Sequence, residues 1–405
     1  MKTELLDNPQ TTYSPDSGPY RTRRNKWARR AALVCLLAVL TGPVLPLLAR
    51  GVDVGGKKTI TIYQGNGYVG GLIEAPLALD PNDPNYQSNL LVTVAGVYQQ
   101  IVAANPAARM AALAEEIAAQ RPDVAGLEEL YTVELAPDIG MAPGQFSIVF
   151  DYVQLLTDAL TAKGAHYKVV VLSTESDVTM PMAASVEPFT VAWGRIIDHE
   201  AILVRTDLPP GYLQASNPRT GRFSIYPQIP FGTQTLSIYH GWCSVDVFTR
   251  GERFRVICSH PQDESLPDVE KAELMELLND VANANMPVMV IGDLNTDPFG
   301  RNGTDSYGVV ATAGFKDTWA VLHPDNLTGG LTFGHDPGLS EPALPFAWRL
   351  DYVLYRGNQF TPVAIESLDP KVGAEPPLWP SDHATITATF FLGNEEAFKG
   401  TPSRR

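Results

Sequence analysis

Short apolar runs alternate along this chain with longer stretches in which apolar residues recur every three or four positions. The short runs are rich in β-branched residues and predict strands, whereas the longer stretches have the spacing of amphipathic helices. The predicted helices are 107–120, 150–163 and 269–284. The predicted strands are 59–63, 124–127, 167–172, 201–204, 235–247, 254–259, 288–291, 352–354 and 385–391.

The order of these elements predicts a mixed α/β fold. Some predicted strands follow one another directly and others are separated by a helix, so a single sheet of only parallel strands is not expected. We predict two packed mixed sheets flanked by helices. Residues 210–232, rich in Pro, Gly and Ser, and residues 325–346 are predicted to be long surface loops near a functional site.

The N-terminal region is predicted to lie apart from this fold. Residues 31–49 contain no charged side chain and are just long enough to span a bilayer as a helix. The basic residues before them orient the N-terminus toward the cytoplasm, so residues 1–30 are predicted to be a disordered cytoplasmic tail. A cleaved signal peptide is the alternative. We expect a linker at 50–58, the folded domain at 59–394, outside the cytoplasm in either case, and a flexible tail at 395–405.

The charge of the chain argues against one class of function. Its 405 residues include 45 acidic and 30 basic side chains, a formal net charge of −15, and the first 50 residues carry a net +5. The remainder therefore carries −20. Because such a body repels a phosphate backbone, it is not expected to bind nucleic acid tightly and without sequence preference. It could still cut nucleic acid if metal ions neutralised the contact locally.

Two of the three cysteines, Cys243 and Cys258, flank a predicted hairpin whose turn is Arg250-Gly251. Their numbering places them opposite each other if the loop has two residues. An oxidising compartment would permit a cross-strand disulfide, but a hydrogen-bonded pair has a Cα spacing that suits a disulfide less well. A disulfide and two buried thiols therefore both remain open.

Polar side chains suited to metal-assisted hydrolysis occur at the ends of predicted strands. A buried strand that ends in Gly-Asp-x-Asn brings Asp293 and Asn295 to the rim of a sheet, on the same side while the chain stays extended. A carboxylate there can orient a water, and an amide can donate to a phosphate oxygen. Glu129, at the end of another buried strand, suits a hard cation such as Mg²⁺. Each pattern alone also fits an ordinary strand-to-turn junction.

Three further residues complete the set of candidates. His260 closes the strand 254–259, but it shares parity with the apolar residues of that strand and is equally consistent with a core histidine. Asp351 precedes an apolar strand and could form a structural ion pair with Arg349. His383 needs a carboxylate to fix its tautomer, and Asp351 could be that partner.

With these residues the chain resembles the endonuclease/exonuclease/phosphatase superfamily, which includes DNase I, exonuclease III, neutral sphingomyelinases and inositol polyphosphate 5-phosphatases. Each motif is weak alone, but together they occur in the order of the family and span roughly residues 59–394. The motifs are Tyr63-Gln64-Gly65-Asn66-Gly67-Tyr68, Pro122-Asp123-Val124 through Glu129, Ser259-His260, Gly292-Asp293-Leu294-Asn295, Arg349-Leu350-Asp351-Tyr352 and Ser381-Asp382-His383.

The resemblance implies a DNase I-like four-layer α/β/β/α sandwich with its site at one rim. It also implies that Glu129 binds Mg²⁺, or Mn²⁺ in its place, with Asn66 beside it, and that Asp382 helps to hold metal or phosphate. Two departures from the family pattern are visible. The first motif has one residue more than usual before its Asn, so Gln64-Gly65 is expected to bulge. Glu128 stands where Gln is common and is expected to change the local charge.

The remaining roles are also implied by the resemblance. Asp293 would orient the attacking water and Asn295 would bind the scissile phosphate. His260 would stabilise charge on the phosphate oxygens. His383, paired with Asp351, would act as the acid or base.

The expected function is therefore an Mg²⁺-dependent phosphodiesterase or phosphatase outside the cytoplasm, acting as a monomer. A nuclease is the first expectation, and arginines or lysines within 205–222 and 250–255 could supply its basic groove. A phosphodiesterase of the sphingomyelinase or inositol-phosphate type is the alternative, favoured by the membrane segment and the acidic body. Residues 223–231 are candidates for the exposed apolar hairpin of a lipid enzyme. A catalytically inactive binding module that keeps the fold is the third reading.

Overall fold

The computed structural model describes residues 58–231, 234–340, 346–369 and 379–393. The predictions for residues 1–30, 31–49, 395–405 and most of the linker fall outside these ranges. Among the described helices, none is by itself long and apolar enough to cross a membrane. One bent pair, Tyr86–Ala103 with Pro106–Gln120, meets the length and composition criteria when the two are taken together.

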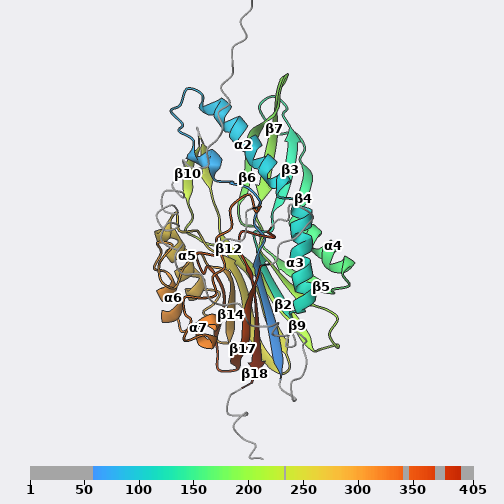
Figure 1. Cartoon of the computed structure of the whole chain (residues 1–405), viewed down its shortest axis with the longest axis vertical. Helices are drawn as coiled ribbons and strands as arrows, with labels where there is room; N and C mark the ends of the chain where they lie inside the picture. The colour runs from blue at the N-terminus through green and yellow to red at the C-terminus, as the bar shows by residue number, and fades with distance from the viewer. Residues whose placement is uncertain (1–57, 232–233, 341–345, 370–378, 394–405) are drawn as a thin grey trace, which may run out of the picture. The chain divides into compact units, whose positions relative to one another are not determined.

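Two six-stranded mixed sheets form the centre of the fold (Figure 1). In each sheet one pair of neighbouring strands is parallel, β1 with β2 and β13 with β14, and the other described pairs are antiparallel. In spatial order the first sheet consists of β17 (Phe360–Leu368), β18 (Thr385–Leu392), β1 (Thr59–Asn66), β2 (Val124–Glu128), β8 (Ala201–Arg205) and β5 (Tyr167–Leu172). The second consists of β15 (Lys316–Asp317), β16 (Asp351–Arg356), β14 (Val288–Asp293), β13 (Glu252–His260), β12 (Gly241–Thr249) and β9 (Leu213–Arg222).

Three hydrophobic clusters hold the layers together. The central cluster joins the inner faces of the two sheets, for example Ile62 of β1 with Val256 of β13. A second cluster packs helices on the outer face of the first sheet, and a third packs helices on the outer face of the second. The helices are α3 (Pro106–Gln120) and α4 (Tyr152–Ala162) on the first sheet, and α5 (Pro267–Asn279) and α6 (Tyr307–Thr312) on the second; the short α7 (Thr318–Leu322) contacts β16 and β17. This arrangement confirms the predicted sandwich of two sheets between helices.

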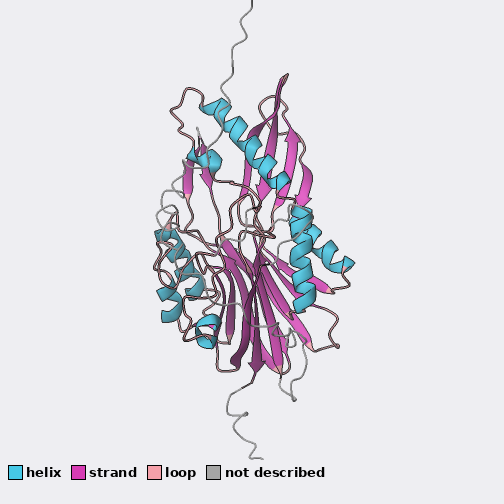
Figure 2. Cartoon of the chain, in the orientation of Figure 1, coloured by secondary structure: helices cyan, strands magenta, loops and turns pink. Residues whose placement is uncertain are grey.

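The structure also contains a third sheet and a further helix, which Figure 2 shows. Neither was predicted from the sequence. The sheet has four antiparallel strands in the order β4 (Ser147–Asp151), β3 (Thr132–Pro137), β7 (Phe189–Ile197) and β6 (Asp177–Val186). It packs against α2 (Tyr86–Ala103), which follows the short 3₁₀ helix η3 (Ala75–Ala78). Proline within β6 and glycine within β7 weaken the strand pattern in the sequence. The strand conformation of these segments therefore depends on pairing with neighbouring strands.

Several predicted boundaries were wrong. The loop expected at 210–232 is largely strand, because β9 occupies Leu213–Arg222 and β10 begins at Gln228. Most side chains of β9 are exposed, so its strand conformation depends on pairing with β12 rather than on burial. The single strand predicted at 235–247 is divided into β11 (Gln234–Ser237), which pairs with β10 (Gln228–Phe231), and β12. The strand β17 was missed, and α5 ends at Asn279 rather than at 284.

The two cysteines of the β12–β13 hairpin are directly opposite each other, as their numbering predicted. Both Cys243 and Cys258 are buried free thiols. Of the two alternatives, the structure therefore shows the thiols and not the disulfide. Burial between the sheets raises the pKa of Cys258 well above its usual value, and its Sγ lies 2.8 Å from Glu128 Oε1.

Candidate active site

The candidate residues meet because the strands that carry them end at one rim of the sandwich. The register of the parallel pair β1–β2 places Asn66 beside Glu128, next to Glu129. Across β14 and β16, Asp293 is directly opposite Asp351. The regular β1–β2 register includes Gln64 and Gly65, so the bulge expected there is absent from this described strand.

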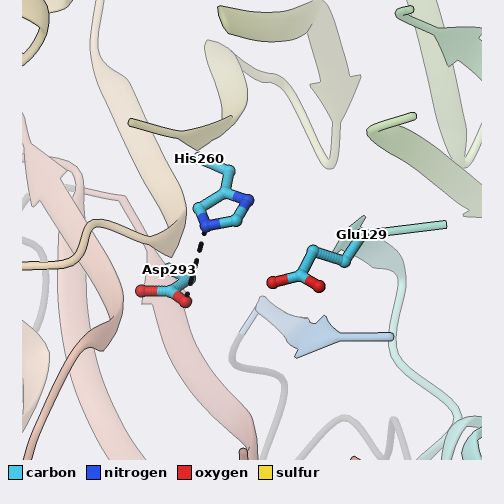
Figure 3. A group of neighbouring side chains, drawn as sticks. All are labelled: Glu129, His260 and Asp293. Atoms are coloured by element: carbon cyan, nitrogen blue, oxygen red, sulfur yellow. Dashed lines mark ion pairs between the residues drawn. The ribbon is translucent and has the colours of Figure 1, made fainter. Parts of the chain in front are cut away.

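One cluster of possible metal ligands comprises Glu129, His260 and Asp293, whose ligand atoms all lie within 4.8 Å of one another. Figure 3 shows the two carboxylates and the imidazole directed toward a common space. His260 Nε2 lies 3.8 Å from Asp293 Oδ2. Asn66 Nδ2 donates to Glu129 Oε1 at 2.9 Å and to Asp293 Oδ2 at 3.2 Å. Residues from four different strand ends thus converge on one point.

His260 points to the same side of β13 as core residues, and this made a core histidine equally plausible. In the structure it is nevertheless a rim residue. Val256 and Cys258 of the same parity belong to the core between the sheets. Because β13 ends at His260, the same direction brings the imidazole to the edge of that core, facing Asp293. Its backbone N–H donates to Glu200 Oε1 at 2.8 Å.

His383 forms a second cluster with Asp351 and Asp293. Its Nδ1 lies 2.8 Å from Asp351 Oδ2 and its Nε2 lies 3.4 Å from Asp293 Oδ2. Burial by itself lowers the pKa of His383, but the charges of Asp351 and Asp293 outweigh burial and raise this pKa well above its usual value. The imidazole is therefore held as a cation between two carboxylates.

Asp351 is fixed from its other side. Gln64 Nε2 donates to Asp351 Oδ1 at 2.7 Å and to Glu128 Oε2 at 2.9 Å. Burial, and then the neighbouring charge of Asp351, raise the pKa of Glu128 well above its usual value. The expectation that Glu128, in the place of the more common amide, changes the local charge remains a prediction.

Arg349 is committed elsewhere, because its Nη1 contacts Asp317 Oδ2 at 2.5 Å. The structural ion pair between Arg349 and Asp351, which the sequence also allowed, is not among the described ion pairs. The structure thus shows Asp351 hydrogen-bonded to His383, the other of the two predicted arrangements.

Asn295 and Asp382 lie at the periphery of these clusters. Asn295 has a left-handed backbone with φ of 53°, so the extended chain assumed for residues 293–295 was wrong. Its backbone N–H donates instead to Asp293 Oδ1 at 3.0 Å, and its Nδ2 donates to the Pro261 carbonyl at 2.9 Å. Asp382 Oδ1 lies 4.0 Å from His383 Nε2, and burial raises the pKa of Asp382 to about 7. Their catalytic and metal-binding roles remain predictions.

The sequence model of the Endonuclease/Exonuclease/phosphatase family matches residues 89–383. This chain belongs to that family. No curated protein matches it. The solved structures that resemble it include an endonuclease/exonuclease/phosphatase family protein from Bacteroides thetaiotaomicron, with 13% identity over 83% of this chain and 99% of that chain and a TM-score of 0.50.

Two further structures cover a similar share of this chain. Truncated Caenorhabditis elegans TDP2 is 16% identical over 82% of this chain and 97% of that chain, with a TM-score of 0.45. A mannosyl-6-phosphatase of Bacteroides thetaiotaomicron is 13% identical over 82% of this chain and its whole length (100%), with a TM-score of 0.48. At 13% identity, the likeness to the family protein with a TM-score of 0.50 concerns the fold alone.

In this family member the rim contains a buried residue that the sequence did not reveal. Glu200 is 1% exposed, and its Oε1 fixes the end of β13 through the backbone of His260. Burial raises the pKa of Glu200 well above its usual value. The sequence signal was the polar run 198–200 just before the buried strand β8, which resembles an ordinary loop.

The donor set of the first cluster fits a hard divalent cation. Glu129 and Asp293 are two carboxylates that converge on one neutral amide, that of Asn66. Burial raises the pKa of Asp293, because it disfavours the charged carboxylate. Mg²⁺ prefers one or two carboxylates together with waters. Glu129 and Asp293, with His260 beside them, would hold such an ion.

Proposed function

We propose that this protein is a divalent-cation-dependent phosphoester hydrolase in which Asp293 organises the attacking water. The observation that carries this proposal is the position of one atom, Asp293 Oδ2. It lies 3.2 Å from Asn66 Nδ2, 3.4 Å from His383 Nε2 and 3.8 Å from His260 Nε2. An oxygen surrounded by three nitrogens at a strand end is oriented before substrate arrives, as efficient catalysis requires.

The side chains divide the reaction between them. A cation bound by Glu129 and Asp293 would supply charge stabilisation at the phosphate oxygens. The water oxygen forms a bond to phosphorus while the bond from phosphorus to the leaving oxygen breaks. The proton lost by the water passes to the Asp293 carboxylate, which the His383 imidazolium stabilises, and the leaving oxygen takes a proton from solvent. His260 and Asn295 donate hydrogen bonds to the non-bridging oxygens, and Asp351 holds the His383 ring.

Most of the arginines predicted to form a nucleic-acid groove lie away from the rim, which favours a substrate with one phosphoester group over a long polyanion. The turn of the β12–β13 hairpin, at residues 250–251, is at the opposite end of the hairpin from His260. Arg253 and Arg255 pair with Asp246 at 3.2 and 2.9 Å. Arg205 also lies far from Glu129, because it follows the residue opposite Val124, at the other end of β2. These arginines therefore do not line a groove at the rim. Arg222 is the exception, because it lies opposite Gly241 of β12, which in turn pairs with His260.

We also propose that the catalytic domain works outside the cytoplasm, as residues 31–49 indicate. The proposal rests on their uncharged sequence and the basic residues before them. Protease digestion of intact cells that express the full chain tests it: loss of the domain from intact cells supports this location, and protection until lysis contradicts it.

The activity test uses the purified full-length protein with bis(p-nitrophenyl) phosphate, with Mg²⁺ or Mn²⁺ and with a chelator. Metal-dependent release of nitrophenol should fall by a factor of about 10² or more in Asp293→Asn. Asp246→Asn, a buried aspartate in β12 that pairs with arginines, is the matched control and should retain activity. Hydrolysis that survives chelation, or that is equal in Asp293→Asn and the wild type, would contradict the proposal.

Nicking of supercoiled plasmid under the same conditions tests the nuclease form. Nicking at low enzyme concentration that requires both metal and His383 would establish a nuclease. Activity on the small diester without nicking would support the class of substrate proposed above.

A further inference from the structure

We propose that a cavity between α2 and the four-stranded sheet is a subsite for the hydrocarbon part of the phosphoester substrate. This inference rests on the proposed function and adds the chemical class of the group attached to the phosphate. The cavity has a volume of about 60 Å³. On one side it is lined by residues of α2, such as Val94 and Ile101, and on the other by residues of β3, β6 and β7.

The chemistry of the cavity is apolar. Its sheet side is formed by side chains that include Val133, Val178, Met180 and Met182. The two charged residues that border it, Glu134 and Arg195, form an ion pair of 3.0 Å with each other. A cavity without free polar partners holds water poorly and accepts hydrocarbon, and the flexible methionines can adapt to its shape.

Gly194 keeps this cavity open. It lies within β7, where a glycine weakens a strand and often marks the close approach of another group. No neighbour requires the glycine, because an added Cβ would have only Met182 Sδ within 4 Å, at 3.5 Å. Its backbone is not in the left-handed region either, since no positive φ is recorded for it. The backbone and the neighbouring atoms therefore do not require glycine here, and the absence of a side chain leaves the cavity unfilled.

Two short segments of the chain run between the catalytic rim and the cavity. Val133 lines the cavity and is four residues after Glu129, a distance of at most about 13 Å in an extended chain. Ile196 also lines it and is three residues before His199, whose backbone carbonyl accepts from Leu130. In this proposal, the alkyl group of a phosphoester bound at Glu129 would follow these segments to the space between α2 and the sheet.

A third such segment precedes η3. Ile73 lines the cavity, and its neighbour Glu74 interacts electrostatically with Glu129 and Asp382. The catalytic rim is therefore acidic where the cavity begins. A substrate with many phosphates would be repelled at this border, whereas a single phosphoester attached to a hydrocarbon would place only its uncharged part there.

The test compares methyl, butyl and octyl p-nitrophenyl phosphodiesters, below their micelle concentrations, with the purified full-length protein and Mg²⁺. In the wild type, kcat/KM should rise by about fourfold for each methylene that enters the cavity and should then level off. In Gly194→Leu the added side chain fills the cavity, so the rise should disappear while methyl ester hydrolysis stays within about threefold of wild type. Thr190→Leu, an exposed position of the same strand, should keep the rise.

Each other outcome has a defined meaning. Equal kcat/KM for all three esters in the wild type, or an undiminished rise in Gly194→Leu, would overturn the subsite. If Gly194→Leu does not fold, Val94→Phe fills the cavity from the α2 side and must give the same loss. A rise that persists in the folded Val94→Phe protein would equally refute it. Failure to hydrolyse even the methyl ester would refute the proposed function instead.

Discussion

Replacement of Asp351 by Asn isolates the charge that supports His383. The two shapes are nearly the same, so the change removes one negative charge 2.8 Å from His383 Nδ1 and little else. At an effective dielectric constant of about 20, a charge pair at this separation interacts by about 6 kcal/mol. Hydrogen bonds to charged groups contribute about 1.5–3 kcal/mol net. We take the upper hydrogen-bond value as the lower bound and the full charge interaction as the upper bound. The loss in transition-state stabilisation should therefore lie between about 3 and 6 kcal/mol.

This range corresponds to a decrease of about 10² to 10⁴ in kcat/KM. The change also removes the largest of the three charges that raise the pKa of His383, whereas Asp293 at 3.4 Å and Asp382 remain. The imidazole should therefore lose its proton at a lower pH in the variant, and the alkaline limb of the pH profile should shift downward. Because the cationic imidazole is the form that the site holds, the defect should be larger at pH 8.5 than at pH 6.

The assay is kcat/KM for bis(p-nitrophenyl) phosphate from pH 5 to pH 9 at saturating Mg²⁺. Asp246→Asn removes an aspartate that is equally buried but pairs with Arg255 far from the rim. It should lower the unfolding temperature and leave the pH profile in place. A kcat/KM of Asp351→Asn within threefold of the wild type, with an unmoved alkaline limb, would refute the role assigned to the His383–Asp351 pair.

Three further predictions concern metal binding, packing and pH. Glu129→Gln should weaken Mn²⁺ binding, measured by calorimetry, by about tenfold or more, and excess metal should partly restore its activity; unchanged affinity would exclude Glu129 as a ligand. Gly126→Ala should destabilise the protein by about 1–3 kcal/mol in urea unfolding, because the new Cβ would lie 2.4 Å from Ile291 Cδ1 across the two sheets; a neutral effect would mean that the sheets separate easily. Burial raises the pKa of Glu273 to about 8, above the value of about 4.3 expected in the unfolded chain, so the wild type loses stability as the pH rises through this interval. Glu273→Gln cannot ionise, so its unfolding temperature relative to the wild type should be higher at pH 9 than at pH 4, and an equal difference at both would contradict this pKa.

The sequence by itself determined the layers of the fold and most of the site. Buried strands such as β2 and β14 consist of uninterrupted apolar residues, and the polar residue at the end of each run is visible without coordinates. The order of the motifs also pointed to the family, because strand ends on one rim must carry the residues that act together. Local composition is sufficient for both features, since burial on two faces leaves little choice of residue.

Only the tertiary structure decided the contacts between distant segments. The choice of His383 over Arg349 as the partner of Asp351 depends on where β16 and β18 end relative to each other, which no local pattern encodes. The sequence did not predict the four-stranded sheet, β9 or the cavity beside Gly194, for the same reason. They are formed by backbone pairing and by the packing of α2, not by hydrophobic periodicity. The raised pKa of Glu128 likewise follows from burial between two sheets, because the cost of desolvation depends on residues far away in the chain.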